Sequence, residues 1–330
     1  MLRTHLISSS LLLATAATLG LAATTATTAS ADEGGRPTSY VLPGDAVDAA
    51  NPAGSKFEGI GTDERRGLFY VSEVTGGEIH RGSAGSGQTV EWLEGHGTDG
   101  RSTARGITVD RAGNVYVAGG PNGIGTGRPD LWVYDKEGHL LTALRVPGTA
   151  DAFLNDVAIG RDGAAYFTNS NDPQVFRVAE GANGWEATLW ADATGTVTRS
   201  AGFNLGGIVL SEDRTGFVVA QGNVGRMWRF DARTGAVSAI DLDGADLVNA
   251  DGLVRRGDEL TVVRNFSRMI ATLQVSEDGR ELDLIGQRAS SADRVLTTAK
   301  TLRGRILYVD SKFDEAVASG PYEVITDPTR

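Results

Sequence analysis

A pattern of two short apolar segments around a polar turn recurs six times along the chain, and it constrains the fold more than any other feature. The copies begin at Phe57, Ala104, Leu154, Leu205, Ala250 and Leu296, so successive starts are 45 to 51 residues apart. In the clearest copy, LNDVAIGRDGAAYFTNS, an Asp-Gly turn joins two apolar runs as in a β-hairpin. Each copy is therefore expected to form the first two strands of a repeated unit.

Two further strand-like segments follow each hairpin, because alternating β-branched and aromatic residues favour strands over helices there. In the last unit these segments are EAVASG, from Glu315, and YEVITDP, from Tyr322. Four antiparallel strands in each of six units predict an all-β, six-bladed β-propeller, whereas a β-sandwich would not explain the equal periods. An open ring would expose strand edges, so SYVLPGD, from Ser39, is expected to pair beside YEVITDP.

The first residues have the order of a secretory signal peptide. Arg3 is followed by an apolar segment from Leu6 to Ala23 and by a small-residue sequence that ends at Ala31. The apolar segment is short and rich in Ala and Thr, which favours a cleaved signal over a retained anchor. The expected organisation is a signal peptide at 1–31, a flexible lead-in at 32–38 and a propeller at 39–330. The protein is expected to be secreted.

Composition excludes several classes of function. The sequence has no cysteine, so it has no disulfides, thiol nucleophiles or cysteine-ligated metals. Its 31 basic and 42 acidic residues give a net charge of −11, which disfavours binding to nucleic acid or to anionic membranes. A monomer that binds a small molecule is expected.

One position near the start of each innermost strand should face the central channel, since these strands run along the axis of a propeller. The equivalent positions are Glu58, Arg105, Asn155, Gly206, Asp251 and Thr297. Asn204 lies close enough in sequence to reach the same space. Carboxylate and amide oxygens suit a hard cation such as Ca²⁺, with water or substrate completing its shell. The alternative is that these polar groups only cap turns or bind channel water.

The segments FEGI, LNDVAIGRDGAAYF, FNLGGIVLSED and NADGLV resemble those of the gluconolactonase and senescence-marker-protein (regucalcin) family of six-bladed propellers. The resemblance runs from about Ser39 to Pro328. It implies a divalent metal, usually calcium, held by Glu58, a blade 4 asparagine and Asp251, with Asn155 contacting substrate or completing the metal shell. It also implies hydrolysis of a sugar lactone or similar cyclic ester, with Asp251 as general base.

Two departures from the family pattern modify this expectation. Asn204 stands two residues before Gly206, whereas the family's asparagine directly precedes its glycine, so the loop must deliver Asn204 to the metal. The sequence AFL replaces an arginine that in the family precedes the Asn-Asp pair. Phe153 and Leu154 therefore predict a less polar substrate than an aldonolactone, with Arg105 contributing to substrate binding.

Two function classes remain open at this point. The first is a metal-dependent hydrolase of a small lactone or cyclic ester, and the second is a non-catalytic ligand-binding or protein-interaction propeller with a structural ion. A metal-free scaffold is a third reading. Outside the ring, His80 and His139 are expected to be exposed on outer strands or turns, and His96 to lie nearer the channel.

Overall fold

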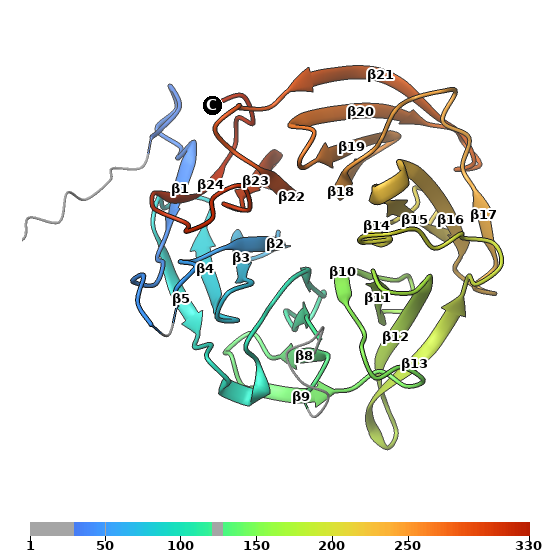
Figure 1. The fold of residues 1–330 in the computed structure, drawn as a ribbon, viewed down its shortest axis with the longest axis horizontal. Helices are drawn as coiled ribbons and strands as arrows, with labels where there is room; N and C mark the ends of the chain where they lie inside the picture. The colour runs from blue at the N-terminus through green and yellow to red at the C-terminus, as the bar shows by residue number, and fades with distance from the viewer. Residues whose placement is uncertain (1–29, 50, 121–127) are drawn as a thin grey trace, which may run out of the picture.

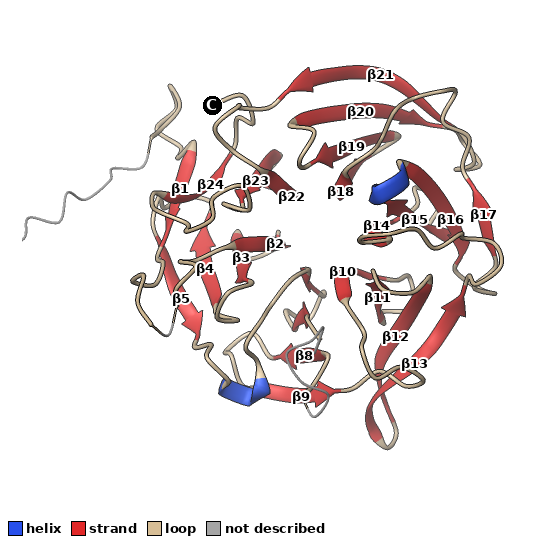
Figure 2. Ribbon diagram, viewed as in Figure 1, coloured by secondary structure: helices blue, strands red, loops and turns tan. Residues whose placement is uncertain are grey.

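The computed structural model describes residues 30–49, 51–120 and 128–330, and there the chain forms a ring of six sheets around a central axis (Figure 1). Every sheet has four strands, and neighbouring strands pair in the antiparallel sense. Figure 2 shows how little of the described chain is helical: two 3₁₀ turns, η1 (Thr98–Gly100) and η2 (Gly222–Val224). The predicted six-bladed propeller is confirmed.

The strands follow one another from the axis outward in each blade. Blades 1 to 3 comprise β2 (Phe57–Asp63), β3 (Leu68–Glu73), β4 (Ile79–Ser83) and β5 (Thr89–Leu93); β6 (Ile107–Val109), β7 (Val115–Ala118), β8 (Leu131–Tyr134) and β9 (Leu140–Leu144); and β10 (Leu154–Ile159), β11 (Ala165–Asn169), β12 (Gln174–Gly181) and β13 (Gly184–Asp192). Blades 4 to 6 comprise β14 (Leu205–Leu210), β15 (Gly216–Gln221), β16 (Arg226–Asp231) and β17 (Val237–Ala239); β18 (Ala250–Arg256), β19 (Glu259–Arg264), β20 (Met269–Val275) and β21 (Leu282–Ala289); and β22 (Leu296–Leu302), β23 (Arg305–Asp310), β24 (Tyr322–Ile325) and β1 (Ser39–Leu42).

The hydrophobic core is divided among the interfaces between adjacent blades. Strand residues alternate between the two faces of a sheet, so each blade packs one apolar face against each neighbour. Between blades 1 and 2, Tyr70 packs in one cluster with Trp132 and Tyr134. Between blades 3 and 4, Tyr166 contacts Phe217 with ring centroids 4.5 Å apart. The ring is thus held by contacts that each involve only two neighbouring blades.

The N-terminal strand closes the ring as predicted. Strand β1 pairs with β24 in antiparallel register, with Tyr40 opposite Val324. The expectation that EAVASG forms the third strand of the last blade was wrong, because residues 315–320 lie outside every strand. Strand β24 takes the third position and β1 the fourth, so the last repeat needs only three strands of its own.

The segment that precedes β1 is mostly outside the described residues, and with it residues 1–29 of the expected signal peptide. The rest of this segment makes a short turn in which Ala31 and Pro37 form an isolated β-bridge. In the part of the chain that the structure describes, no helix has the length and apolar character needed to cross a bilayer.

Candidate functional site

A β-bulge lies near the start of most of the innermost strands. In β2, β10, β14, β18 and β22 the register with the next strand shifts directly after the first residue pair. A bulge leaves residues out of the ladder and redirects their side chains. The second residues of these strands are Glu58, Asn155, Gly206, Asp251 and Thr297. The bulge thus falls at the ring position that was counted from the sequence.

The residue after the ring position is often glycine, and the structure gives the reason. An added Cβ at Gly59, Gly106, Gly207 or Gly252 would lie closer than 3.0 Å to backbone atoms at the start of the next blade's innermost strand or just before it. These four glycines therefore let neighbouring innermost strands touch directly. Where blade 3 has Asp156 instead, its carboxylate accepts a hydrogen bond from the Ile208 amide at 3.1 Å.

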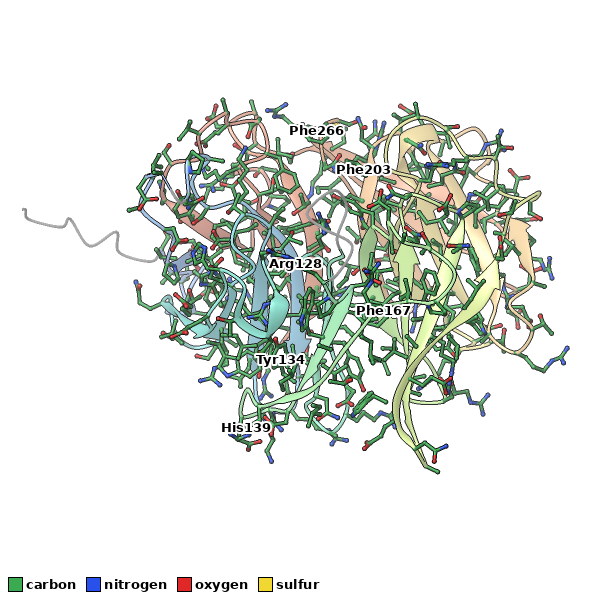
Figure 3. All side chains as sticks on the ribbon, turned by 60° about the horizontal axis from the view of Figure 1, so that its bottom comes forward. Arg128, Tyr134, His139, Phe167, Phe203 and Phe266 are labelled. Carbon is green, nitrogen blue, oxygen red and sulfur yellow. The ribbon has the colours of Figure 1, made fainter. Side chains whose placement is uncertain are left out.

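The ring residues open into a pocket of about 530 Å³. Glu58, Arg105, Asn155 and Asp251 all line it, and Glu58, Asn155 and Asp251 also line a narrow cavity deeper in the channel. The pocket is further lined by four aromatic rings: Phe153, Phe203, Phe266 and Phe313. Figure 3 labels Phe203 and Phe266 at the same end of the molecule, and they are 60% and 54% exposed. Polar groups thus share the pocket with an apolar rim.

The rim was only partly foreseen. Phe153 lines the pocket as expected, and its ring lies 4.8 Å from that of Phe203. Leu154, in contrast, is fully buried in the core between blades 2 and 3. Phe203, Phe266 and Phe313 lie outside the strands, where the repeat pattern contains no periodic information about them.

Asn204 lines the pocket, but its side-chain amide is already hydrogen-bonded to other groups of the protein. Its Oδ1 accepts hydrogen bonds from the Ser200 amide at 2.8 Å and from the side-chain amides of Gln221 and Asn223, both at 3.2 Å. Its Nδ2 donates to backbone carbonyls, including that of Ser170 at 3.2 Å. These bonds hold the loop before β14 in place. An oxygen with three donors is poorly placed to ligate a cation as well.

Thr297 also has a structural partner. It is buried, and its hydroxyl donates to the carbonyl of Glu58 at 2.9 Å. This bond links β22 to β2 and so joins blade 6 to blade 1 at the axis. The ring hydroxyl therefore positions the backbone of Glu58 rather than facing the pocket.

The two ring carboxyls hold their protons unusually tightly. Burial, and to a smaller extent the charges of Asp251 and Asp156, raise the pKa of Glu58 to about 8, although Arg105 opposes the shift. Burial also raises the pKa of Asp251 to about 7, with Asp156 adding to the shift. The amide of Asn265 lowers it by donating to Asp251 Oδ2 at 2.9 Å. Removal from water and the negative charge of nearby carboxylates both disfavour the charged forms of these two groups.

Arg105 is the cationic group of the pocket. Its guanidinium lies 3.9 Å from the centroid of the Phe153 ring, and its Nε lies 3.9 Å from Glu58 Oε2. Among the described residues its buried Nη1 has no hydrogen-bond partner. Burial lowers the pKa of Arg105, but a guanidinium remains charged in proteins. A donor of this kind is available to a substrate oxygen.

The donor set suits a divalent cation in part. A dication between the two carboxyls would offset the cost of burying their charges and the repulsion that Asp251 exerts on Glu58. The side chain of Asn155 makes no hydrogen bond within the described chain, so its oxygen is available as a third ligand. Blade 4 contributes nothing, because Gly206 occupies the ring position and Asn204 is engaged elsewhere. Three protein oxygens fit a calcium-type ion whose remaining ligands are water or substrate.

The opposite mouth of the channel contains another pocket of about 530 Å³, lined by the turns between first and second strands. Its acidic groups are engaged by amides of their own turns or by groups of other strands and turns. Asp110 Oδ1 accepts hydrogen bonds from three backbone amides, those of residues 112 to 114. Asp162 accepts from the Ala164 amide and pairs with Arg177. Glu58 and Asp251, the two ring carboxyls with raised pKa values, line the pocket at the other mouth, which is therefore the candidate site.

Comparison with known proteins supports the architecture. A sequence-family model described as a β-propeller repeat matches residues 95–123. No curated protein sequence matches the chain. Regucalcin from Agrobacterium tumefaciens, described as a calcium-binding protein, superposes with a TM-score of 0.56 at 16% identity, over 88% of this chain and 96% of that chain.

Two other solved structures show the same likeness. Virginiamycin B lyase from Staphylococcus aureus, in an inactive form with quinupristin, superposes with a TM-score of 0.56 at 12% identity, over 87% of this chain and 88% of that chain. The major allergen Mala s 1 of Malassezia sympodialis superposes with a TM-score of 0.60 at 13% identity, over 81% and 91%. At such identities the likeness establishes the fold, and propellers of one fold serve different functions.

Proposed function

We propose that the protein hydrolyses a small lactone or other cyclic ester with an apolar substituent. The reaction would use a divalent cation at the floor of the pocket, and Ca²⁺ is the first candidate for that cation. The observation that carries the proposal is the meeting of Glu58, Asn155 and Asp251 beside Arg105, beneath an aromatic rim. The family resemblance of their sequence motifs and the calcium binding named for the regucalcin neighbour support the same assignment.

Asp251 is the proposed general base. Its carboxylate takes a proton from a water molecule as the water oxygen bonds to the ester carbonyl carbon. When the ring C–O bond breaks, the protonated Asp251 returns the proton to the leaving alkoxide, so that one water is consumed and a hydroxy acid is formed. A base with a pKa near neutrality suits this exchange. Asn265, which donates to Oδ2, fixes the orientation of the carboxylate.

Glu58 and Asn155, together with Asp251, are the residues proposed to hold the cation. A bound dication would polarise the ester carbonyl and stabilise the oxyanion that develops on it. Asn155 is also proposed to contact the substrate, as the family resemblance implies.

Arg105 and the rim are proposed to select the substrate. The free Nη1 donor of Arg105 is suited to a carbonyl or carboxylate oxygen, while Phe153 and Phe203 offer apolar contact to a substituent. Rings that bury apolar area favour less polar ligands over free sugars. An aldonolactone should therefore be a poorer substrate than a lactone with an alkyl or aryl group.

A panel of lactones and esters, assayed with and without a chelator, tests the proposal. Hydrolysis should depend on the cation, and Asp251→Asn should abolish it while leaving the melting temperature in chelator no lower than that of the wild type. Gly206→Asn restores an amide at the ring position of blade 4, where an added Cβ has ordinary contact at 3.6 Å from Asn155 Oδ1. It should tighten Ca²⁺ binding. If the Asp251→Asn variant still hydrolyses the substrate, Asp251 is not the general base.

A non-catalytic ligand-binding propeller is the second candidate, and one contact favours it. Arg105 already faces Glu58, so the pocket can balance a carboxylate charge without a cation. In that case apolar carboxylic acids or lactones would raise the melting temperature in the presence of chelator, and no product would form.

Secretion and a monomeric state are also proposals, to be tested by N-terminal sequencing of exported protein and by its mass in solution.

A further inference from the structure

Three ligand-type side chains converge in blade 1, away from the ring residues. Asp45 lies in the connection from β1 to β2, Glu78 directly precedes β4, and His96 follows β5. Each belongs to a connection at the same end of the blades as the pocket, which Val74 of the β3–β4 turn also lines. The proposed hydrolysis uses none of them.

The geometry at His96 is that of converging ligands. One ligand atom from each of the three residues lies within 4.8 Å of the other two. His96 Nε2 is 3.0 Å from Asp45 Oδ2 and 3.1 Å from Glu78 Oε1. A single ring N–H donates one good hydrogen bond, yet this nitrogen is nearly equidistant from two carboxylates. Bonds of about 2.0–2.2 Å to one central ion would set ligand atoms at roughly these separations.

Glu78 provides an independent sign of a missing partner. It is 2% exposed, and neither of its carboxylate oxygens has a hydrogen bond to any described residue. Its buried neighbour Glu73 is well satisfied by comparison, since His80 Nε2 lies 3.1 Å from one oxygen and the Thr75 hydroxyl donates to the other at 2.9 Å. A buried carboxylate without donors is costly. Apart from His96 Nε2, which lies 3.1 Å from Oε1 and is shared with Asp45, the described residues place no cationic or donating group in hydrogen-bond contact with this carboxylate.

The nearby arginine does not supply that group. Arg101 is fully buried, but its Nε donates to the Gly77 carbonyl, its Nη2 to the Glu94 carbonyl and its Nη1 to Tyr134. None of these bonds reaches the Glu78 carboxylate.

The backbone around Glu78 leaves space for its carboxylate only. An added Cβ at Gly76 or at Gly95 would lie closer than 3.0 Å to the Glu78 oxygens. The amide of His96 donates to the Gly76 carbonyl at 2.8 Å, which fixes the linker against the turn. Two glycines thus form a cradle that presents the carboxylate to His96.

From these contacts we infer that Asp45, Glu78 and His96 form a binding site for a transition-metal dication of the Zn²⁺ type. One imidazole nitrogen and two carboxylates are ligands that zinc takes readily, and imidazole disfavours the hard Ca²⁺ ion. The His96 side chain is 55% exposed, so water can complete the coordination shell. This site is chemically distinct from the all-oxygen set in the channel.

A cation here would also reinforce ring closure. Asp45 lies three residues beyond the end of β1, whereas Glu78 and His96 belong to blade 1 and its exit. Binding would tie the connection from the closing strand to the first blade. Because the ion binds only the folded arrangement, it should raise the melting temperature.

Zn²⁺ and Co²⁺ titrations of the full chain, after chelator treatment and with excess Ca²⁺ present, test the inference. The wild type should bind one Zn²⁺, gain thermal stability and show a visible Co²⁺ absorption band. His96→Asn suits the left-handed backbone at this position (φ 53°) and should weaken binding about tenfold or more. His139→Asn is the matched control: this exposed histidine pairs with Asp135 but belongs to no group of three ligand-type side chains among the described residues, so the variant should bind Zn²⁺ as the wild type does.

Glu78→Gln provides a second variant should His96→Asn fold poorly, and the same loss is expected of it. Asp251→Asn should retain the Zn²⁺ site, which separates this result from the fate of the proposed hydrolysis. If His96→Asn and Glu78→Gln both bind Zn²⁺ and Co²⁺ as tightly as the wild type does, the inference is overturned. His96 is then only an imidazolium shared by two carboxylates.

Discussion

At the scale of single residues, the cost of ionising the two carboxyls of the candidate site depends on whether a positive charge lies beside them. Glu58 and Asp251 come from distant parts of the sequence to one pocket, where Glu58 is buried and Asp251 is partly exposed. Among the described residues that line the pocket, Arg105 is the one cationic group that offsets this charge. The free energy of the folded protein should therefore depend on pH through these two groups.

In chelator, stability should fall as pH rises from about 4 to about 8. The folded pKa values are about 8 for Glu58 and about 7 for Asp251, whereas unfolded carboxyls titrate near 4. In that window the folded state retains protons that the unfolded state has lost, so raising the pH favours unfolding. Urea midpoints at pH 5 and pH 8.5 should differ more in the wild type than in the Glu58→Gln, Asp251→Asn double variant.

A bound dication should reverse part of this loss, and more strongly at pH 8.5 than at pH 5, because protons compete with it for the same oxygens. If the urea midpoint changed equally between pH 5 and pH 8.5 in the wild type and the double variant, the two carboxyls would have ordinary pKa values in the folded protein.

The ring residues could be predicted because their positions repeat with the blades. Counting from the second strand located Glu58, Asn155 and Asp251, and the structure places all three at one pocket. Asn204 could not be assessed in this way, because its hydrogen bonds depend on the conformation of an irregular loop. His80 was expected to be exposed and is buried, since the alternation of β4 does not reveal that the Glu73 carboxylate lies 3.1 Å from His80 Nε2.

At the scale of strands, the bulge and the glycine that follows the ring position act together. The bulge turns the ring residue toward the axis, and the next residue faces the neighbouring blade. Gly207 meets the carbonyl of Asp251, so the packing of β14 on β18 also sets the position of the proposed base. A change at this glycine should disturb both stability and the site.

Gly207→Ala should destabilise the protein by about 1–3 kcal/mol, the range for overpacked cores, because its Cβ would collide with the backbone at Asp251. Gly206→Ala is the adjacent control, since its Cβ would meet only Asn155 Oδ1 at 3.6 Å. Its effect should stay within about 0.5 kcal/mol. Urea denaturation measures both. Equal losses in the two variants would mean that close approach between the innermost strands is not what requires glycine.

Strand content was largely predictable, whereas strand position in the last blade was not. The hairpins have Asp-Gly or similar turns between apolar runs, and these local patterns specify the first two strands of each blade. EAVASG has the composition of a weak strand. The last sheet does not need it as a strand, because β24 takes the third position and β1, about 280 residues earlier in the chain, takes the fourth. A local pattern carries no information about that competition.

At the scale of the whole molecule, the ring depends on one strand that is distant in sequence from its own blade. Strand β1 pairs with β24, and its residues Tyr40 and Leu42 join the cluster between blades 6 and 1. On the other side, Val41 forms a bridge with Gln88 at the turn between β4 and β5. Closure therefore completes both the last sheet and the last of the interfaces between blades.

Tyr40→Ala should be costly for this reason. The Tyr40 ring is 1% exposed, meets Phe69 edge-on at 4.9 Å, and its hydroxyl donates to the Ala84 carbonyl at 3.2 Å. Removing a buried aromatic ring leaves a cavity, so a loss of about 3–5 kcal/mol is expected in urea denaturation. Val47→Ala, at a half-exposed position just beyond β1, is the control and should change stability by less than about 0.5 kcal/mol.

A chain that begins after Leu42 extends the same test to the strand itself. Without β1, strand β24 would present an unpaired edge, and such edges pair with other chains. The shortened protein should therefore associate or aggregate at concentrations where the longer chain stays dispersed, as light scattering would show. A stable, dispersed propeller lacking β1 would mean that contacts between blades close the ring without the shared sheet.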